Sequence, residues 1–478
     1  MIFWAVWPEI ILSLVGILLL LASALVPQAR QRWLGWLAAA GFVGAGIAAL
    51  ELPHNGTVAL QGAVVLDPLT LAFRLLFLAA GLLVTMFSVD FIMARGKDLG
   101  EFLALVAFAT TGAMTLAASW NIVSLYVALE LLSVSSYVLA AFLRDDPRSH
   151  EAGLKYLLNG ALASAILLFG LSLAYGLSGE TAIPAMATHL RAALATQYGG
   201  VVWVALGLIL AGLAFKIAAA PFHLWAPDAY EGAPTPVTAY LMVVAETAGF
   251  AAILRLISTA MGPLQFHWGI WLAGLAVLTM TVGNVTALWQ SNIKRMLAYS
   301  SVAQVGYILA GVAVATTVGT GSVLFYLATY LFTTLGAFAV VVALSVRGQG
   351  DAISDYGGLG RRSPWLAGLL TLFLASYVGI PATAGFMGKL GLIGAAVNGH
   401  LVWLAVAIAV NSAISIGYYW GVARTVWLDP VPEGAGAISH SGGVGLSLGL
   451  CAVGCVALGV VPQIFFHLAF WASAGMAH

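Results

Sequence analysis

The chain has 478 residues, of which 62% are hydrophobic and 8% are charged. Its 18 Lys and Arg residues balance its 18 Asp and Glu residues, so the formal net charge is zero. A soluble domain carries about 25% charged residues, and this chain has too few to cover a water-exposed surface of its size. The balance also lacks the basic excess that nucleic-acid binding requires. The composition therefore predicts a protein embedded in the lipid bilayer and argues against nucleic acid as a partner.

Fourteen apolar runs are long enough to cross a membrane, since a spanning helix needs about 20 mostly apolar residues. The runs are 4–26, 33–50, 67–93, 101–119, 121–143, 150–178, 200–221, 234–260, 268–290, 293–315, 320–346, 364–396, 400–428 and 444–470. They predict an all-α polytopic membrane protein with about 14 transmembrane helices. The first run lacks the basic segment and small-residue cleavage site of a signal peptide, so we expect it to be retained as helix 1.

The basic residues are distributed unevenly between the two sides of the membrane. The loops after runs 1, 3, 5, 9, 11 and 13 hold Arg30, Arg32, Arg95, Lys97, Arg144, Arg148, Arg295, Arg347, Arg361 and Arg362, with Arg424 at a run's end. The other side offers only Arg191 and Arg255 near its loops. Because cytoplasmic loops carry the excess of Lys and Arg, both termini are expected on the outer side.

Two runs contain residues that break helices, each close to a lysine. In AGLAFKIAAAPFHLW, Lys216 lies five residues before Pro221, and in YVGIPATAGFMGKLG, Pro381 precedes Lys389. Proline removes a backbone donor and clashes with the preceding turn, so helices 7 and 12 are expected to be broken. Each is the fourth helix of a five-helix block, which suggests two inverted repeats. The expected organisation is 1–100 for helices 1–3, 101–262 for the first repeat, 263–428 for the second, and 429–478 for a loop and helix 14.

Four ionisable residues within the runs are the strongest functional candidates. Glu130 and Glu246 lie mid-run with no cation within four residues, and a charge at the bilayer centre costs ~3 kcal/mol. Lys216 and Lys389 lie beside the expected breaks, and a buried lysine can lose its proton whereas an arginine does not. We expect these residues to move protons. The alternatives are a neutral glutamic acid bonded to a neighbouring helix and a lysine that reaches the interface with its ammonium group.

Three further residues have stronger alternatives. Lys155 follows Glu151 at the i,i+4 spacing of an ordinary helical ion pair. Lys294 either takes part in proton transfer or anchors the start of run 10 at the cytoplasmic surface. His223, seven residues after Lys216, either relays protons or caps the break. Asp228 and Glu231 are expected in a loop.

Motifs of soluble enzymes are absent from the sequence. GFMGKL contains a Gly-Lys pair but lacks the first glycine and the Ser or Thr of a phosphate-binding loop. Cys451 and Cys455 lie four residues apart, which is no zinc-binding spacing. We therefore expect no metal, no bound cofactor and no redox chemistry on this chain.

Three stretches carry a resemblance to a known family. FKIAAAPFHLWAPDAYEGAPTPVTAYL (215–241), NIKRMLAYSSVAQVGYI (292–308) and GIPATAGFMGKL (379–390) are similar to the antiporter-like membrane subunits of respiratory complex I and of multisubunit cation/proton antiporters. The segment YEGAPTPV resembles the corresponding segment of the subunits designated N in proton-translocating NADH:quinone oxidoreductase. Lys389 disfavours a resemblance to subunit M, because the corresponding residue of subunit M is expected to be a carboxylate.

The resemblance implies 14 helices, two inverted five-helix repeats and a row of titratable residues along the membrane midplane. The residues that match the family's relay positions are Glu130 on helix 5, Lys155 on helix 6, Lys216 on helix 7 and Lys389 on helix 12. Two positions depart from the pattern. Glu246 stands where subunit N usually has a helix-8 lysine, and Gln304 stands where a histidine is common in helix 10.

The function implied by the resemblance is proton translocation within a bacterial plasma-membrane complex. NADH, FMN, iron–sulfur clusters and quinone are expected on other subunits, and the partners are expected to be the neighbouring membrane subunits M, K and J. An ionised Glu130 near Lys216 would hold a proton on the lysine, and their separation would release it. The alternatives are a subunit of a sodium/proton antiporter, a subunit of a hydrogenase-type complex, and a scaffold whose lysines have lost their role.

Overall fold

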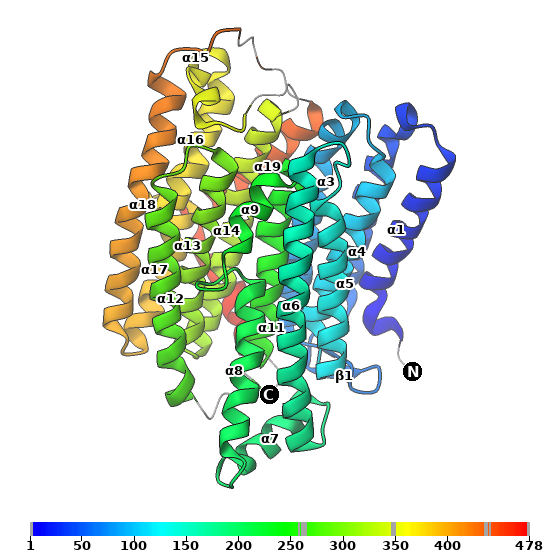
Figure 1. Cartoon of the computed structure of the whole chain (residues 1–478), viewed down its shortest axis with the longest axis vertical. Coiled ribbons are helices and arrows are strands. Elements are labelled where there is room, and N and C mark those ends of the chain that lie inside the picture. The colour runs from blue at the N-terminus through cyan, green and yellow to red at the C-terminus, as the bar shows by residue number, and fades with distance from the viewer. Residues whose placement is uncertain are drawn as a thin grey trace.

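The computed structural model describes residues 3–256, 259, 265–345, 350–434, 438 and 441–475. Within this part most residues lie in helices, and the long helices run along one common axis (Figure 1). Thirteen of the described helices are long and apolar enough to cross a membrane. The prediction of an all-α polytopic membrane protein is confirmed.

The elements follow the chain in three groups. The first comprises η1 (Phe3–Val6), α1 (Trp7–Leu25), η2 (Gln28–Trp33), α2 (Leu34–Glu51), β1 (Thr57–Ala59), β2 (Val64–Leu66) and α3 (Pro68–Ala94). The second comprises α4 (Leu99–Ala118), α5 (Ile122–Ala140), α6 (Pro147–Ser178), α7 (Ile183–Leu194), α8 (Gly199–Lys216), α9 (Trp225–Gly232), α10 (Thr235–Tyr240), η3 (Leu241–Ala245) and α11 (Glu246–Leu256). The third comprises α12 (Gln265–Ala287), α13 (Ile293–Ala313), α14 (Thr317–Ser345), η6 (Ile353–Tyr356), α15 (Leu359–Arg362), α16 (Pro364–Val378), α17 (Ala384–Asn398), α18 (Val402–Leu428), α19 (Gly442–Val460) and α20 (Pro462–Ala474).

The predicted run 364–396 forms two shorter helices, α16 and α17, and neither is among the thirteen long helices. Gly379 ends α16 in the left-handed conformation, with φ at +90°, which glycine adopts without steric cost. In the earlier run 200–221, α8 stops at Lys216, and Ala218 has a positive φ of 55°. In both places the chain leaves the helix beside a lysine.

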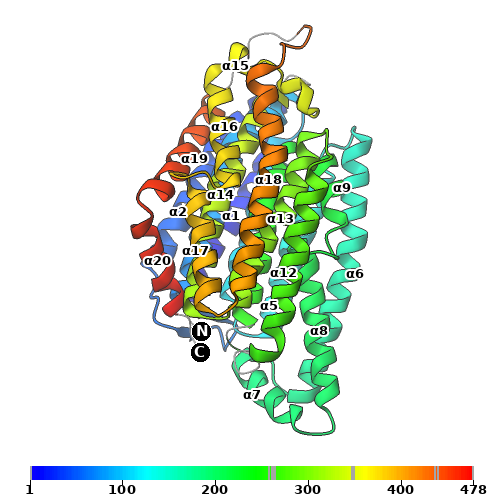
Figure 2. The same cartoon turned by 90° about the vertical axis from the view of Figure 1, so that its left-hand side faces the viewer.

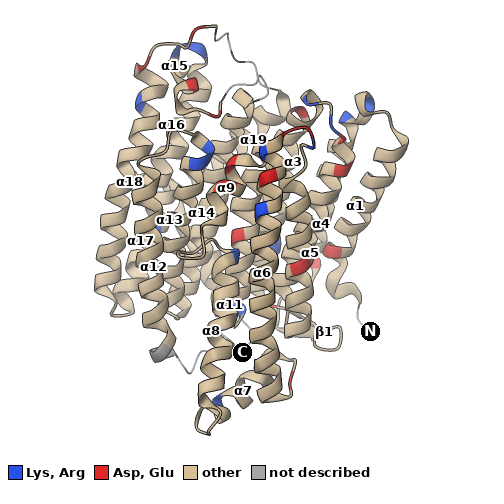
Figure 3. Cartoon of the chain, in the orientation of Figure 1, with Lys and Arg blue, Asp and Glu red and all other residues tan. Residues whose placement is uncertain are grey.

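Helix α7 and the antiparallel pair β1–β2 are among the elements outside the predicted runs. Thr57 lies opposite Leu66 in the pair, and both features connect spanning helices. Both lie at the end of the bundle that also holds the first and last described residues (Figure 1). Many charged residues lie toward the opposite end, the end that holds α15, and others lie in the middle of the bundle (Figure 3). Arg347 and the expected boundary between 262 and 263 fall outside the described residues.

Burial divides the bundle into central and peripheral helices. The α10–α11 span, α13 and α14 are almost wholly buried, and α13 packs between α12 and α14. Figure 2 shows α12 and α18 at the front, on the outside of the bundle. The outer helices keep apolar faces exposed, as Leu25 on α1 and Trp36 on α2 illustrate. In a membrane these faces contact lipid, and the central helices form the site described next.

Candidate functional site

Ionisable side chains lie inside the bundle on five helices. Lys216, Glu246, Lys294 and Lys389 are buried, and Glu130 on α5 is half-buried. Such groups inside a membrane protein are rare and are usually functional. The contacts of each residue decide what it can do.

Glu246 lies at the junction of four helices. It begins α11 directly after the π-helical turn Leu241–Ala245, a local widening that often accompanies functional sites. Tyr230 and Ser301 donate hydrogen bonds of 2.9 and 3.0 Å to its Oε1, and Tyr330 donates one of 3.1 Å to Oε2. These hydroxyls come from α9, α13 and α14. No described Lys or Arg forms an ion pair with Glu246, so hydroxyl groups alone stabilise this carboxyl in the described structure.

Lys216 is the last residue of α8, and its contacts lead to α5. Its Nζ donates a 2.9 Å hydrogen bond to Ser133 Oγ and lies 6.0 Å from the ring centroid of Tyr156. Ser133 is one helical turn from Glu130, which accepts a hydrogen bond from Ser164 of α6. Among the described contacts, Glu130 and Lys216 do not pair directly. A serine on α5 separates the carboxylate from the ammonium.

Lys389 is held by the C-terminal end of α16. Its Nζ donates to the carbonyl oxygens of Tyr377 (2.8 Å) and Val378 (3.0 Å) and to Ser412 Oγ (2.7 Å). The last carbonyls of a helix have no intrahelical partner, so the end of α16 supplies acceptors for a buried cation. The ammonium also lies 4.7 Å from the ring centroid of Tyr307. Each of the three N–H groups of a charged lysine therefore has an acceptor in this arrangement.

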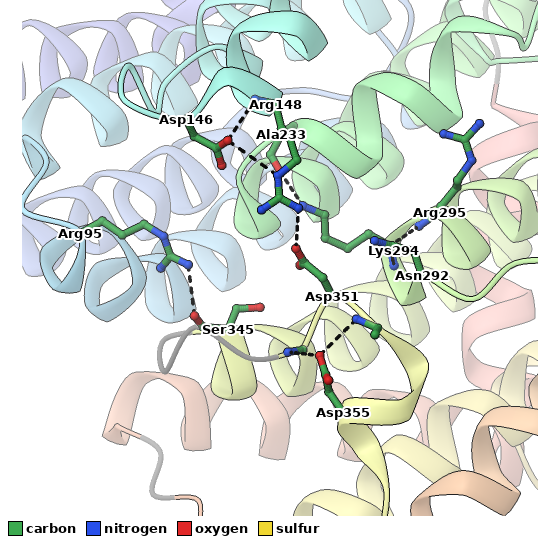
Figure 4. Close-up of polar contacts among 12 residues, drawn as sticks. Arg95, Asp146, Arg148, Ala233, Asn292, Lys294, Arg295, Ser345, Asp351 and Asp355 are labelled. Carbon is green, nitrogen blue, oxygen red and sulfur yellow. Dashed lines mark hydrogen bonds and ion pairs between the residues drawn. The ribbon is translucent and has the colours of Figure 1, made fainter. Parts of the chain in front are cut away.

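Lys294 lies at the wall of a polar cavity of about 180 Å³ (Figure 4). Its Nζ donates a 2.9 Å hydrogen bond to the carbonyl of Ala233. The other charged residues that line the cavity are Arg95, Asp146, Arg148, Glu231, Asp351 and Asp355. Arg148 bonds Asp351 at 3.1 Å and thereby connects α6 to the segment before η6. The cavity connects the charged end of the bundle with a buried lysine.

Lys155 belongs to a surface network at the charged end. It forms ion pairs with Glu151 at 2.7 Å and Asp228 at 2.8 Å, and its side chain is 43% exposed. Arg295 bonds Asp228 and Glu231, both at 2.8 Å. The helical pair with Glu151 that the spacing allowed is therefore present, and Lys155 is less buried than the other lysines of the predicted set.

The expectation that Asp228 and Glu231 lie in a loop is wrong. They lie on α9, a short helix that Trp225 anchors by stacking on Tyr156, with ring centroids 4.5 Å apart. Burial raises the pKa of Asp228, but hydrogen bonds from Lys155 and Arg295 outweigh this effect and hold the pKa below its ordinary value.

His223 lies between α8 and α9 and is mostly buried. Its Nδ1 has no hydrogen-bond partner among the described residues, and its ring meets Tyr299 edge-on with centroids 6.5 Å apart. No described hydrogen bond joins it to Lys216 or Glu246. The structure therefore does not bring His223 together with the other predicted residues.

A group of hydroxyl and amide side chains between Glu246 and Lys389 was not predicted. Tyr326 donates to Gln304 at 2.5 Å, and Gln304 donates to Tyr419 at 3.3 Å. Tyr419 also bonds Ser300 and stacks on Tyr377, with centroids 5.3 Å apart. The signal in the sequence is the presence of tyrosines within apolar runs, because a buried phenol needs a hydrogen-bond partner.

The chain was compared with known proteins, and one family matches more than half of it. The family described as "NADH:quinone oxidoreductase/Mrp antiporter, TM" matches residues 119–415. NADH-quinone oxidoreductase subunit N of Trichlorobacter lovleyi is 42% identical, with 97% of this chain and 95% of the relative covered. The subunit of the same name from Moorella thermoacetica is 41% identical, with 95% and 94% covered.

Solved structures agree with these relatives. A chain of respiratory complex I from Thermus thermophilus has a TM-score of 0.81 and 31% identity, covering 97% of this chain and 99% of that one. A chain of the archaeal membrane-bound sulfane sulfur reductase has a TM-score of 0.85 and 25% identity, covering 99% and 97%. A chain of the Mrp complex from Dietzia, at 22% identity with 98% and 97% covered and a TM-score of 0.84, shares the fold.

Proposed function

The chain belongs to the NADH:quinone oxidoreductase/Mrp antiporter family as an antiporter-like, proton-translocating membrane subunit, and we propose that its buried Glu and Lys residues carry the protons. In this proposal Glu130, Lys216, Glu246 and Lys389 form the relay, and Lys294 supplies it. The observation that carries the proposal is the site of Glu246, where three hydroxyl groups surround a carboxyl that has no described cationic partner.

The hydroxyl groups suit a carboxyl that changes protonation state. A carboxylate only accepts hydrogen bonds, whereas a carboxylic acid must also donate one. Ser301, Tyr230 and Tyr330 can each donate to the carboxylate, and any of them can rotate to accept from the acid. Glu246 can therefore gain or lose a proton without leaving a buried polar group unpaired. A lysine in the same place would need acceptors only.

Glu246 is an acidic group at the centre of the relay, where the family pattern usually has a basic lysine. An ionised Glu246 attracts the proton that Lys216 releases, and a protonated Glu246 passes it toward Lys389. Gly249, one turn further along α11, lies against Lys216 and Ile217, which keeps α11 close to the end of α8. Lys155 and His223 have lesser roles in this proposal: Lys155 holds α9 in place, and His223 lines the break.

Lys294 is the entry point in this proposal. It borders the polar cavity, and Ser301, seven residues further along α13, bonds Glu246. At 1.5 Å per residue this separation is ~10.5 Å along one face of the helix. A proton taken up at the cavity then has a short path to the central carboxyl.

The proposals on cofactors, partner subunits and location follow from the similarity to the relatives. We propose that redox chemistry, with NADH, FMN, iron–sulfur clusters and quinone, takes place on other subunits, and that subunits M, K and J are the neighbours. We also propose a bacterial plasma-membrane location with both termini outside, and two inverted repeats at 101–262 and 263–428. A sodium/proton antiporter or hydrogenase-type complex is the second candidate, and the family description, which also names the Mrp antiporter, supports the antiporter.

The test is the substitution Glu246→Gln in the assembled complex, reconstituted in vesicles with NADH and quinone. Glutamine keeps the size and removes the titration, so we expect proton pumping to fall at least about tenfold, equivalent to ~1.4 kcal/mol in the barrier. Glu51→Gln, at the exposed end of α2, is the matched control and should pump normally. Normal pumping by Glu246→Gln would refute the relay role, and pumping that requires sodium ions would favour the second candidate.

A further inference from the structure

A groove far from the relay lies between α2, α3 and the start of α19. Its volume is about 450 Å³, and Arg32, Trp36, Thr85, Asp90 and Gly442 are among the residues that line it. Figure 2 shows α2 and α19 on the same side of the molecule. The groove is open to the surroundings of the bundle at the charged end, and none of the relay residues lines it.

The rim of the groove carries one positive and one negative charge. Arg32 and Asp90 form an ion pair, and their side chains are 68% and 22% exposed. The guanidinium has five N–H donors and the carboxylate two oxygens, so one contact between them leaves both able to bind further groups. A ligand with both an anionic and a cationic group matches this rim, and a purely anionic ligand meets the repulsion of Asp90.

The start of α19 adds a second site for an anionic group. Ser441 caps the helix by accepting a hydrogen bond of 3.4 Å from the backbone N–H of Val444. At Gly442 there is open space where a side chain would be, and a Cβ at Gly443 would lie 2.4 Å from the carbonyl oxygen of Met86. The N-terminal end of a 19-residue helix therefore borders the groove, and such an end attracts anions.

Thr85 provides the independent evidence for a ligand. Its side chain is completely buried and lines the groove, and its Oγ1 has no hydrogen-bond partner among the described residues. Leaving a buried hydroxyl unpaired costs about 1–3 kcal/mol. Thr85 precedes Asp90 by five residues on α3, so it lies ~7.5 Å deeper along the helix axis. A ligand that spans this depth and carries a carbonyl oxygen would satisfy the hydroxyl.

We propose that this groove binds one glycerophospholipid with an amine-bearing, zwitterionic head group. The phosphate contacts Arg32 and the start of α19, and the ammonium contacts Asp90. An ester carbonyl accepts a hydrogen bond from Thr85, and the acyl chains cover the apolar surface around Leu446. Trp36, which is 76% exposed, lies at the rim as tryptophans do where a membrane meets water.

The experiment measures phospholipid that stays bound to the purified, assembled complex after detergent washing. The complex is first loaded from vesicles of phosphatidylethanolamine and phosphatidylglycerol in equal amounts, and retained lipid is counted by native mass spectrometry. We expect Thr85→Val and Arg32→Gln each to lower retained phosphatidylethanolamine at the groove at least fivefold. Thr111→Val, which removes a buried hydroxyl that bonds within its own helix, is the control and should retain it.

Proton pumping is measured on the same preparations. We expect all three variants to pump normally, so that failure of the relay and failure of the lipid site are distinguishable. Equal retention by wild type and both Thr85→Val and Arg32→Gln would overturn the proposal, as would preferential retention of phosphatidylglycerol. Arg32 is exposed at the surface, so its variant remains informative if Thr85→Val does not assemble.

Discussion

Glu246 and Lys389 are both buried ionisable groups, but their surroundings differ in kind. Glu246 is bonded by three side-chain hydroxyls from three helices. Lys389 is bonded by two backbone carbonyls at the end of α16 and by one hydroxyl. Hydroxyls can donate or accept, whereas carbonyls only accept. The first site can therefore form hydrogen bonds with either protonation state, whereas the second offers one acceptor for each of the three N–H groups of a charged lysine. A neutral lysine has two N–H groups and would leave one of these acceptors without its partner.

Of the substitutions at these two sites and around them, replacing Lys389 should lower proton pumping most. Lys389→Gln removes the group that titrates, and Lys389→Arg keeps a permanent charge, because arginine does not release its proton in proteins. We expect both to lower NADH-driven pumping at least about tenfold in reconstituted vesicles, or ~1.4 kcal/mol. If Lys389→Arg pumped normally, charge alone would suffice, and proton release from this site would be excluded.

Removing hydroxyls around Glu246 should have an intermediate effect. Tyr330→Phe and Ser301→Ala each delete one donor and leave two, so we expect pumping to fall about two- to fivefold, equivalent to about 0.5–1 kcal/mol, within the range for a single hydrogen bond. The double variant should lose more than the sum of the two. Pumping rates of the single and double variants measure this, with Thr371→Ser, whose hydroxyl lies in α16 away from the site, as the control. Unchanged rates in the double variant would contradict the role of the hydroxyl groups.

Gln304 lies in the group of polar side chains between Glu246 and Lys389, and its amide does not titrate. Substituting it therefore tests the hydrogen bonds between the two sites separately from proton binding. Gln304 links Tyr326 to Tyr419, and we expect Gln304→Leu to reduce pumping about twofold by interrupting these hydrogen bonds. Gln304→His can make the same bonds and should pump within about twofold of wild type. A large increase in pumping by Gln304→His would show that proton transfer at this position is limited by the lack of a titrating group and not by hydroxyl rotation.

The smallest effect is expected at Asp228, on the surface network. Its pKa is lowered in the folded state, so its ionisation stabilises the fold above its ordinary pKa and this contribution disappears as the pH falls through the lowered value. Asp228→Asn should lower the stability of the detergent-solubilised complex at pH 7 by at most about 1 kcal/mol. Thermal melts of both proteins should converge as the pH falls below the lowered pKa of Asp228. A difference that stays constant with pH would contradict this assignment.

The sequence predicted those features that depend on local composition. The apolar runs matched thirteen spanning helices, and the residues around Pro381 located the end of α16 beside Lys389. It also singled out Glu246, because an isolated carboxyl within an apolar run is conspicuous.

The partners of these residues could not be predicted. Tyr230, Ser301 and Tyr330 reach Glu246 from 16, 55 and 84 residues away, and no local pattern encodes contacts at such separations. The depth of Lys155 could not be predicted for a different reason: it lies within an apolar run, yet α6 is 32 residues long and extends to the charged end of the bundle. A long helix carries residues of different depth within one run.

The central claim is that Glu246 gains and loses a proton during turnover. Infrared difference spectroscopy of the reconstituted complex, comparing resting and NADH-energised states, detects the carbonyl stretch that only a protonated carboxyl group gives. We expect a carboxyl band that changes with turnover in the wild type and in Glu51→Gln and is missing from Glu246→Gln. The same turnover-dependent carboxyl band in Glu246→Gln as in wild type would contradict the account.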